Sequence, residues 1–236
     1  MEGFFFFSDW NSQTEDECNM LGLHPWCLHT AASVIAEREL WKFADNNPDI
    51  DVTSSKFFYF AFSFFPPFKN AFTVLPGFTF GPYDRGQATD QHRSGTFAWI
   101  SELLHGPPGR SMIPNAAPFS PNYVHVADVA RAHVAALSIG PHPQRRRKRV
   151  LLVAGYVLWP EVVAHLSEAM PEIRERLPSL AGGPDPRGQV SSFARFETRN
   201  AREILGIEEF KGWKEAIEDA VKDMLRVEST MTDPEV

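Results

Sequence analysis

The sequence predicts an α/β protein, and three stretches carry this prediction. In Trp26–Phe43, apolar residues recur at three- and four-residue steps, which is the spacing of an amphipathic helix with one packed face. Asn46-Asn47-Pro48 ends this helix because proline cannot continue it, and Asp51-Val52-Thr53 then begins a strand. Further along the chain, Arg149–Ala154 has the sequence RVLLVA, a continuous apolar run typical of a buried parallel strand.

The other elements are predicted in chain order from the same signals. Gly95–His105 has helical spacing and ends at Gly106-Pro107-Pro108, which is a helix stop. Tyr123–Leu137 is predicted to form a short strand followed by a helix. Helices are also predicted at Pro160–Met170, Thr198–Leu205 and Trp213–Leu225, and we expect the last ten residues to fray.

Composition and charge exclude several functional classes. The net charge of −7 over 236 residues gives no reason to expect nucleic acid as the main partner. The two cysteines, Cys18 and Cys27, are too few for a disulfide framework and suit a reducing compartment, so we expect a cytoplasmic protein. Together with His24 and His29 they match no structural zinc spacing, so no metal site is predicted.

Phenylalanine is concentrated in two short tracts. Phe4–Phe7 and Phe57–Phe72 contain twelve of the 20 phenylalanines. The apolar run within the second tract is shorter than the ~20 residues of a membrane-spanning helix, and Pro66-Pro67 would break it. We therefore expect no membrane-spanning segment.

The helix Trp26–Phe43 and the strand after it resemble the active-site helix and following strand of the extended short-chain dehydrogenase/reductases. The resemblance is to the NAD(P)-dependent epimerase/dehydratase group, which includes the dihydroflavonol-reductase and cinnamoyl-CoA-reductase-like enzymes. Ala36-Glu37, Trp41 and Phe43 match the family pattern Y-x-A-S-K-x-x-A-E-x-x-x-W-x-F. This alignment puts His29 at the position of the family's tyrosine and Ser33 at the position of its lysine.

Later stretches extend the resemblance over residues 8–236. They are PGFTFGP from Pro76, YVHVADVARAHVAAL from Tyr123, RVLLVAG from Arg149 and LGI from Leu205. In the second stretch Asp128 matches, whereas His125 and Ala127 replace a family aspartate and arginine. The resemblance implies a Rossmann-like, doubly wound sheet with a small substrate-binding lobe. We expect this sheet to be incomplete, because no stretch resembles the family's N-terminal nucleotide-binding part.

Residues 1–7 and 54–72 lie outside this resemblance. Removing Ser54–Phe72 would join Asp51-Val52-Thr53 to Thr73–Pro82 as one buried strand that runs into the PGFTFGP turn. Because phenylalanine, serine and proline have pyrimidine-rich codons, we interpret both aromatic tracts as retained intron sequence. The alternative is a genuine aromatic insertion or lid.

In the family, hydride passes between nicotinamide C4 and a carbonyl carbon while the tyrosine hydroxyl supplies or removes a proton. A phenol has an ordinary pKa near ~10, and a lysine one helical turn away favours its ionised form. None of the four tyrosines of this chain is followed by lysine at the fourth residue. His29 could act as an acid–base group, but Ser33 supplies no positive charge. We therefore expect impaired catalysis at His29 and Ser33, the alternative for His29 being a structural role.

The resemblance implies NAD or NADP as cofactor, with Pro76, Gly77 and Phe78 at its nicotinamide side. The 15 glycines contain no G-x-G-x-x-G or G-x-x-G-x-x-G motif, so no turn that binds the pyrophosphate is predicted. Cofactor binding is therefore in doubt for this chain. The alternative interpretation of Pro76-Gly77-Phe78 is a turn that ends a strand.

By resemblance the function is that of an NAD(P)-dependent oxidoreductase that reduces a small aldehyde or ketone, and a homo-oligomer is a further expectation. The competing interpretation is a non-catalytic remnant or a pseudoenzyme that binds a partner through an exposed sheet edge. Arg145–Arg149, RRRKR, is interpreted as a solvated loop before the Val150 strand, with an anionic-surface or nuclear-localisation patch as the alternative.

Overall fold

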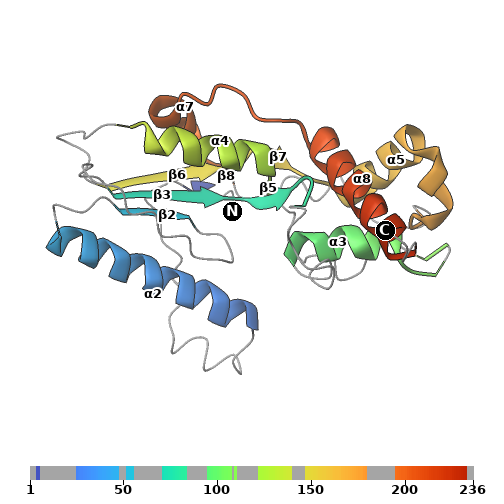
Figure 1. Cartoon of the computed structure of the whole chain (residues 1–236), viewed down its shortest axis with the longest axis horizontal. Coiled ribbons are helices and arrows are strands. Elements are labelled where there is room, and N and C mark those ends of the chain that lie inside the picture. The colour runs from blue at the N-terminus through green and yellow to red at the C-terminus, as the bar shows by residue number, and fades with distance from the viewer. Residues whose placement is uncertain are drawn as a thin grey trace.

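The computed structural model describes residues 4–5, 25–47, 52–55, 71–83, 95–107, 109–110, 122–139, 147–179 and 195–232. These residues form a sheet with helices on both faces and, at one end of it, a lobe made mostly of helices (Figure 1).

The main sheet consists of three parallel strands in the order β2-β3-β6. They are β2 (Val52–Ser55), β3 (Ala71–Pro76) and β6 (Arg147–Leu152). In the register of the sheet, Val74 lies between Ser55 and Val150. Val74 and Val150 are fully buried, as expected for parallel strands covered on both faces.

Helices cover this sheet on its two faces (Figure 1). α2 (Pro25–Asn46) lies along one face, beside β2, and α4 (Val126–Leu137) and α7 (Arg199–Leu205) lie along the other. Gly206 caps α7 in the left-handed conformation (φ 65°), which explains the Leu-Gly pair at that helix end. The predicted α/β class, with helices on both faces of a parallel sheet, is confirmed.

The other strands among the described residues form two smaller sheets. β3 passes through Gly77 into β4 (Phe78–Phe80), which pairs in parallel with β5 (Asn122–His125). β5 also pairs antiparallel with β7 (Gly155–Tyr156). β1 (Phe4–Phe5) and β8 (Arg195–Phe196) form a separate parallel pair.

The helical lobe has its own apolar core. It contains α3 (Gly95–Leu104), α5 (Trp159–Ala169), the 3₁₀ helix η2 (Pro171–Arg176) and α8 (Trp213–Thr232). Fully buried side chains from all four helices meet there: Ile100, Leu103, Leu166, Ile173 and Ile217. A second core, built around Val74, Val124, Val129 and Val150, joins the main sheet to α4 and α7.

The strand near Asp51 differs from the one that the sequence predicts. In the chain as it stands, Val52–Ser55 and Ala71–Pro76 are two strands that lie side by side, with Val52 opposite Ala71. Ser54 and Ser55, which the sequence assigned to the insertion, belong to β2. Most of residues 54–72 lies outside the described residues, so the intron interpretation stays a prediction.

Two expected boundaries were wrong. α8 continues to Thr232, and the side chain of Val227 is buried, so the final helix does not fray at residue 227. β6 begins at Arg147, which places Arg147–Arg149 in a strand rather than in a solvated loop. Residues 145–146 lie outside the described residues. No helix among the described residues is long and apolar enough to span a membrane.

Candidate active site

The helix expected to carry the catalytic pair is α2, and its faces are sharply divided. Ala31, Val34, Glu37 and Trp41 are buried at three- and four-residue steps, so this face packs on the sheet. His29 is exposed, and Ser33, one helical turn later, is half-buried. Ser33 therefore lies at the edge of the packed face and His29 on the exposed side, both in the first half of the helix.

An ion pair that the sequence analysis missed fixes α2 on the sheet. Arg149 Nε donates to Glu37 Oε1 (2.8 Å) and its Nη2 donates to Glu37 Oε2 (3.3 Å). Trp41 Nε1 also donates to Glu37 Oε1, at 3.3 Å. The Glu37 side chain is 1% exposed and the Arg149 side chain is 12% exposed, so both charges are almost fully shielded from solvent. The Ala36-Glu37 match was the available signal for Glu37, whereas nothing local marked Arg149 as its partner.

The predicted cofactor loop is held in place by two backbone contacts. Gly77 N donates to the carbonyl of Leu152 (2.9 Å), and Phe78 N donates to Asn122 Oδ1 (3.4 Å). A Cβ atom at residue 77 would lie 2.6 Å from Asn122 Oδ1 and 3.2 Å from the Asn122 carbonyl oxygen, so a larger residue would displace the Asn122 side chain that bonds Phe78 N. The loop is therefore built as a joint between the two sheets.

This geometry does not fit a cofactor held by the amides of the loop. Pro76 has no N–H, and the N–H groups of Gly77 and Phe78 already donate to protein acceptors. The hydroxyl of Thr79 donates to the Gly77 carbonyl at 3.3 Å, which occupies one acceptor of the loop as well. Within the described residues, the amides of Gly77 and Phe78 are therefore already bonded to the protein, and the sequence has no glycine-rich turn to supply others.

α2 and the loop are separated by an edge strand. α2 packs beside β2, and Pro76–Phe78 follows β3, the strand on the inner side of β2. The carboxyl ends of parallel strands are the edge where ligands bind in doubly wound folds. Ser55, Pro76 and Leu152 end their strands at this edge.

The segment Tyr123–Asp128 belongs to a stretch that resembles the family, and its polar side chains contact neighbouring parts of the fold. His125 Nδ1 accepts from the Ala127 amide (2.9 Å) and caps α4, the role that aspartate often has at a helix start. Its Nε2 lies 3.3 Å from Asp219 Oδ2 on α8. Because Nδ1 accepts a hydrogen bond, Nε2 is the ring nitrogen that can donate to this carboxylate.

Asp128 and Tyr123 hold the connection between α7 and α8. Asp128 Oδ2 accepts from the Lys211 amide (2.8 Å), and its Oδ1 accepts from Arg131 Nη2 (2.8 Å). The Tyr123 hydroxyl donates to the Lys211 carbonyl at 3.3 Å. Burial raises the pKa of the Tyr123 phenol, so it stays protonated near neutral pH. These polar groups are engaged in positioning the chain.

The described residues contain no group of three or more His, Cys, Asp or Glu side chains that could hold a metal ion. The side chain of Cys27, and Cys18 and His24 altogether, lie outside what is described.

Comparison with known proteins identifies solved structures that share this architecture. No family model matches the chain, and no curated protein does. Among solved structures, Gre2 from Candida albicans is 21% identical, with a TM-score of 0.72 over 96% of this chain and 59% of its own. Yeast methylglyoxal/isovaleraldehyde reductase Gre2, complexed with NADPH, is 20% identical, with a TM-score of 0.68 over 96% of this chain and 58% of its own.

The chain has the fold of these reductases. Vestitone reductase from alfalfa shares it at 15% identity, with a TM-score of 0.60 over 95% of this chain and 59% of its own. The fold expected from the resemblance to extended short-chain reductases is thus confirmed. The chain spans 58–59% of the length of these reductases.

Proposed function

We propose that this chain derives from an NAD(P)H-dependent reductase of small aldehydes or ketones in the extended short-chain dehydrogenase/reductase family, and that the chain by itself does not catalyse the reduction. The observation that carries the proposal is α2. It has the framework of the family's active-site helix, Ala36-Glu37 and Trp41, on a reductase fold, but has His29 and Ser33 at the two reactive positions.

The expected loss of catalysis has a direct chemical reason. Carbonyl reduction needs a proton donor beside the carbonyl oxygen and a cation that tunes this donor and holds the nicotinamide ribose. Ser33 is neutral, so it cannot stabilise an ionised partner at residue 29. The amides of Gly77 and Phe78 are engaged by Leu152 and Asn122, which leaves them no hydrogen for a cofactor.

Binding and turnover test this proposal on the purified chain. NADPH and NADH binding are measured by calorimetry, and NADPH oxidation is followed with methylglyoxal and with isovaleraldehyde. We expect no saturable binding at micromolar concentration and no oxidation above that of the His29→Ala variant. Micromolar binding together with turnover that His29→Ala abolishes would overturn the proposal, because it would make His29 the working acid.

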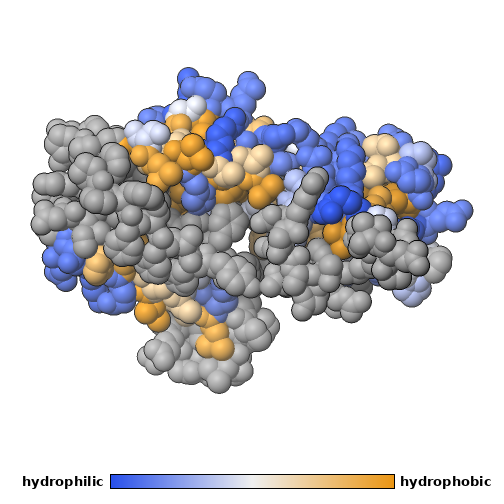
Figure 2. Space-filling view, viewed as in Figure 1, coloured by the Kyte–Doolittle hydropathy of each residue, from blue (hydrophilic) through white to orange (hydrophobic). Residues whose placement is uncertain are grey.

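The outer face of α2 favours a second candidate function. In this alternative the chain is a non-catalytic protein that associates with a second copy of itself. Leu28, Ile35 and Phe43 are 39%, 48% and 44% exposed, which is unusual for large apolar side chains on one stripe of a helix. Apolar residues reach the surface along the segment where α2 lies (Figure 2).

The charges of α2 favour an antiparallel partner helix. Residues 25–36 carry no formal charge, whereas residues 37–45 contain Glu37, Arg38, Glu39, Lys42 and Asp45. Two copies related by a twofold axis between Ile35 and Ala36 would place Leu28 against Phe43. The charged half of each helix would then face the uncharged half of the other, which avoids like-charge contacts.

Sedimentation of the chain tests this association. We expect a concentration-dependent dimer that Ile35→Lys dissociates. Val134→Lys is the matched control, because Val134 is an equally apolar and 65% exposed residue on α4. A monomer at all concentrations, or a dimer that persists in Ile35→Lys, would exclude this interface.

A further inference from the structure

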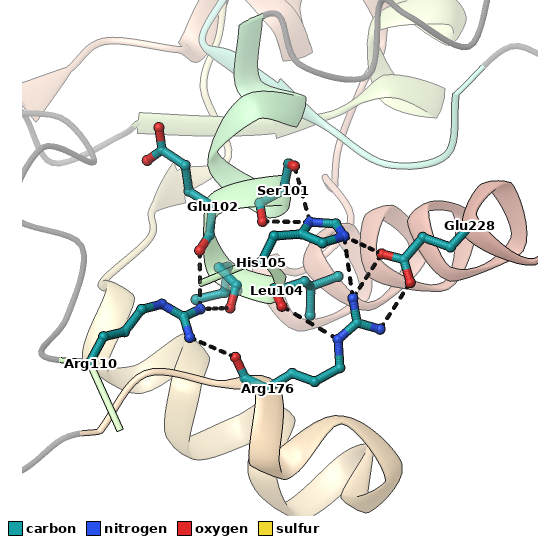
Figure 3. Close-up of polar contacts among 8 residues, drawn as sticks. Ser101, Glu102, Leu104, His105, Arg110, Arg176 and Glu228 are labelled. Atoms are coloured by element: carbon teal, nitrogen blue, oxygen red, sulfur yellow. Dashed lines mark hydrogen bonds and ion pairs between the residues drawn. The ribbon is translucent and has the colours of Figure 1, made fainter. Parts of the chain in front are cut away.

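The polar groups at the end of α3, in the helical lobe, are bonded within the chain. Arg110 Nη2 donates to the carbonyls of Glu102 (3.1 Å) and Leu103 (2.6 Å), which the last turn of a helix leaves without an intrahelical donor (Figure 3). Arg176 donates to Glu228 of α8 through two bonds, of 2.9 and 2.8 Å. This part of the lobe therefore has its hydrogen-bonding groups paired internally.

The edge of the main sheet at β2 is different. Val52 lies opposite Ala71 and Ser55 lies opposite Val74, and among the described residues β2 pairs with β3 alone. A strand with a single neighbour presents a row of backbone N–H and C=O groups on its other side, which can pair with a strand of another chain. The outer side of β2 is thus a place where a further strand can add.

Ile35, in the exposed apolar stripe of α2, points toward this same edge. Glu37 points toward β6, because both of its oxygens accept from Arg149. Residues two apart in an α-helix point about 160° apart, since each residue turns the helix by about 100°. Ile35 therefore points away from β6, which in the strand order β2-β3-β6 is toward the outer side of β2. α2 also packs beside β2, so the stripe and the strand edge are neighbours (Figure 1).

A single twofold axis can serve both features. An axis perpendicular to the sheet, beside β2, reverses the direction of each element and leaves it on its own face of the sheet. It pairs β2 with β2 of the second copy, and α2 with α2 of the second copy, both antiparallel. Antiparallel is also the direction that the charges of α2 favour.

The sequence around β2 suits an antiparallel second copy. β2 itself has no charged residue, whereas Asp51 precedes it and Lys56 follows it in the sequence. With Val52 opposite Ser55 of the second copy, an acidic residue of one chain and a basic residue of the other are next in line at each end. A parallel pair in register would put like charges side by side, which is unfavourable.

We propose that a second copy of this chain adds its β2 to the outer side of β2 in antiparallel orientation, so that the two main sheets join into one across a dimer. The proposal rests on the association of two copies through α2 and specifies the strand contact that accompanies it. An antiparallel strand at the edge of an otherwise parallel sheet is a common arrangement. The contact supplies backbone partners to the strand edge and covers Ile35 at the same time.

Amide exchange at several protein concentrations tests the strand contact. In the concentration range where sedimentation shows the dimer, we expect the amides of residues 52–55 that point away from β3 to exchange about tenfold more slowly than in the monomer. The amides of α5 should show no such dependence. Ile35→Lys should keep the fast rate at all concentrations, and the control Val134→Lys should behave as the wild type.

The outcomes separate this inference from the association on which it rests. A dimer in which the exchange of residues 52–55 does not depend on concentration would overturn the strand contact and leave the α2 contact standing. A monomer at all concentrations would overturn both.

Exchanging charges tests the antiparallel orientation. Lys56→Asp would bring acidic residues together at both ends of the strand pair, so we expect dimer affinity to fall about tenfold. The double variant Asp51→Lys/Lys56→Asp keeps opposite charges together and should restore the affinity. Lys214→Asp, the same change at an exposed position of α8, is the matched control and should leave the affinity unchanged. A double variant as weak as Lys56→Asp would overturn the antiparallel pairing.

Discussion

Glu37 and Arg149 are 112 residues apart in the chain and form a nearly dry ion pair between α2 and β6. Burying two charges is costly, and their attraction offsets this cost only when the geometry and further hydrogen bonds are good. Both oxygens of Glu37 accept from Arg149, and Trp41 adds a third bond. The pair therefore sets the rotation of α2, and with it the direction in which His29 and Ser33 face.

Breaking this pair should be strongly destabilising. We expect Glu37→Gln to lower the free energy of unfolding by about 3 kcal/mol, because it removes the buried negative charge that Arg149 Nε and Nη2 bond. Denaturant unfolding measures the change. Glu39→Gln is the control: the Glu39–Lys42 pair is 61% and 68% exposed, so its loss should cost less than about 0.5 kcal/mol. Equal effects of the two variants would contradict the assigned role of Glu37.

Removing a buried hydroxyl on β3 should have the opposite effect and raise the stability of the chain. Thr73 is fully buried, and its Oγ1 has no hydrogen-bond partner among the described residues. Thr73→Val keeps the shape of the side chain and removes the unsatisfied group, so we expect a gain of about 1 kcal/mol in denaturant unfolding. Thr79→Val should instead destabilise, since the hydroxyl of Thr79 donates to the Gly77 carbonyl. A Thr73→Val variant less stable than the wild type would show that this hydroxyl has a partner.

At the scale of elements, the joint between β3 and β4 determines how the lobe attaches to the sheet. The two strands are continuous apart from Gly77, whose amide bonds the end of β6 at Leu152. Phe78, the first residue of β4, packs its ring on that of Trp99 of α3 at 4.8 Å. Phe78 thus links the end of the main sheet to the aromatic side of the lobe.

Adding a methyl group at this joint should disrupt it. Gly77→Ala would place Cβ 2.6 Å from Asn122 Oδ1, and we expect a loss of about 2 kcal/mol from the forced shift. Gly212→Ala is the control, because a Cβ there meets no atom within 4 Å. Asn122→Ala in the Gly77→Ala background should recover part of the loss in the same unfolding experiment. If Gly77→Ala and Gly212→Ala are equally stable, the strands are not held as closely as described.

At the scale of the whole molecule, the described residues form two apolar cores, one beneath α4 and α7 and one inside the helical lobe. Among the described residues β2 pairs with β3 alone, at the edge of the main sheet. We therefore expect the pairing of β3 with β6, which holds the buried residues Val74 and Val150, to survive the removal of residues 54–72.

Removal of residues 54–72 tests this expectation and the intron interpretation together. Val52-Thr53 would then take the places of Ala71 and Phe72 opposite Arg147 and Lys148, so the ladder between β3 and β6 would keep its length. We expect the deletion variant to stay folded, with a Tm within about 4 °C of that of the full chain. A transcript that joins Thr53 directly to Thr73 would support the intron origin. An unfolded deletion variant, or transcripts that always include the segment, would favour a genuine insertion.

The sequence by itself determined those features that depend on neighbours along the chain. Three- and four-residue spacing marked α2 and α8, the Pro-Gly pair marked the end of β3, and RVLLVA marked β6 to within two residues of its start. These signals are local because helix periodicity, proline and glycine act through the backbone within one or two turns. The candidate positions His29 and Ser33 followed from the same local framework.

The tertiary structure alone decided which distant groups meet. Arg149 appeared as part of a basic run, and only its position opposite α2 made it the partner of Glu37. β2 became a separate strand because its backbone groups bond those of β3. His125, a substitution in the sequence, became the cap of α4 and a contact to Asp219. Such pairings depend on how the elements pack in space, and no spacing within one segment encodes them.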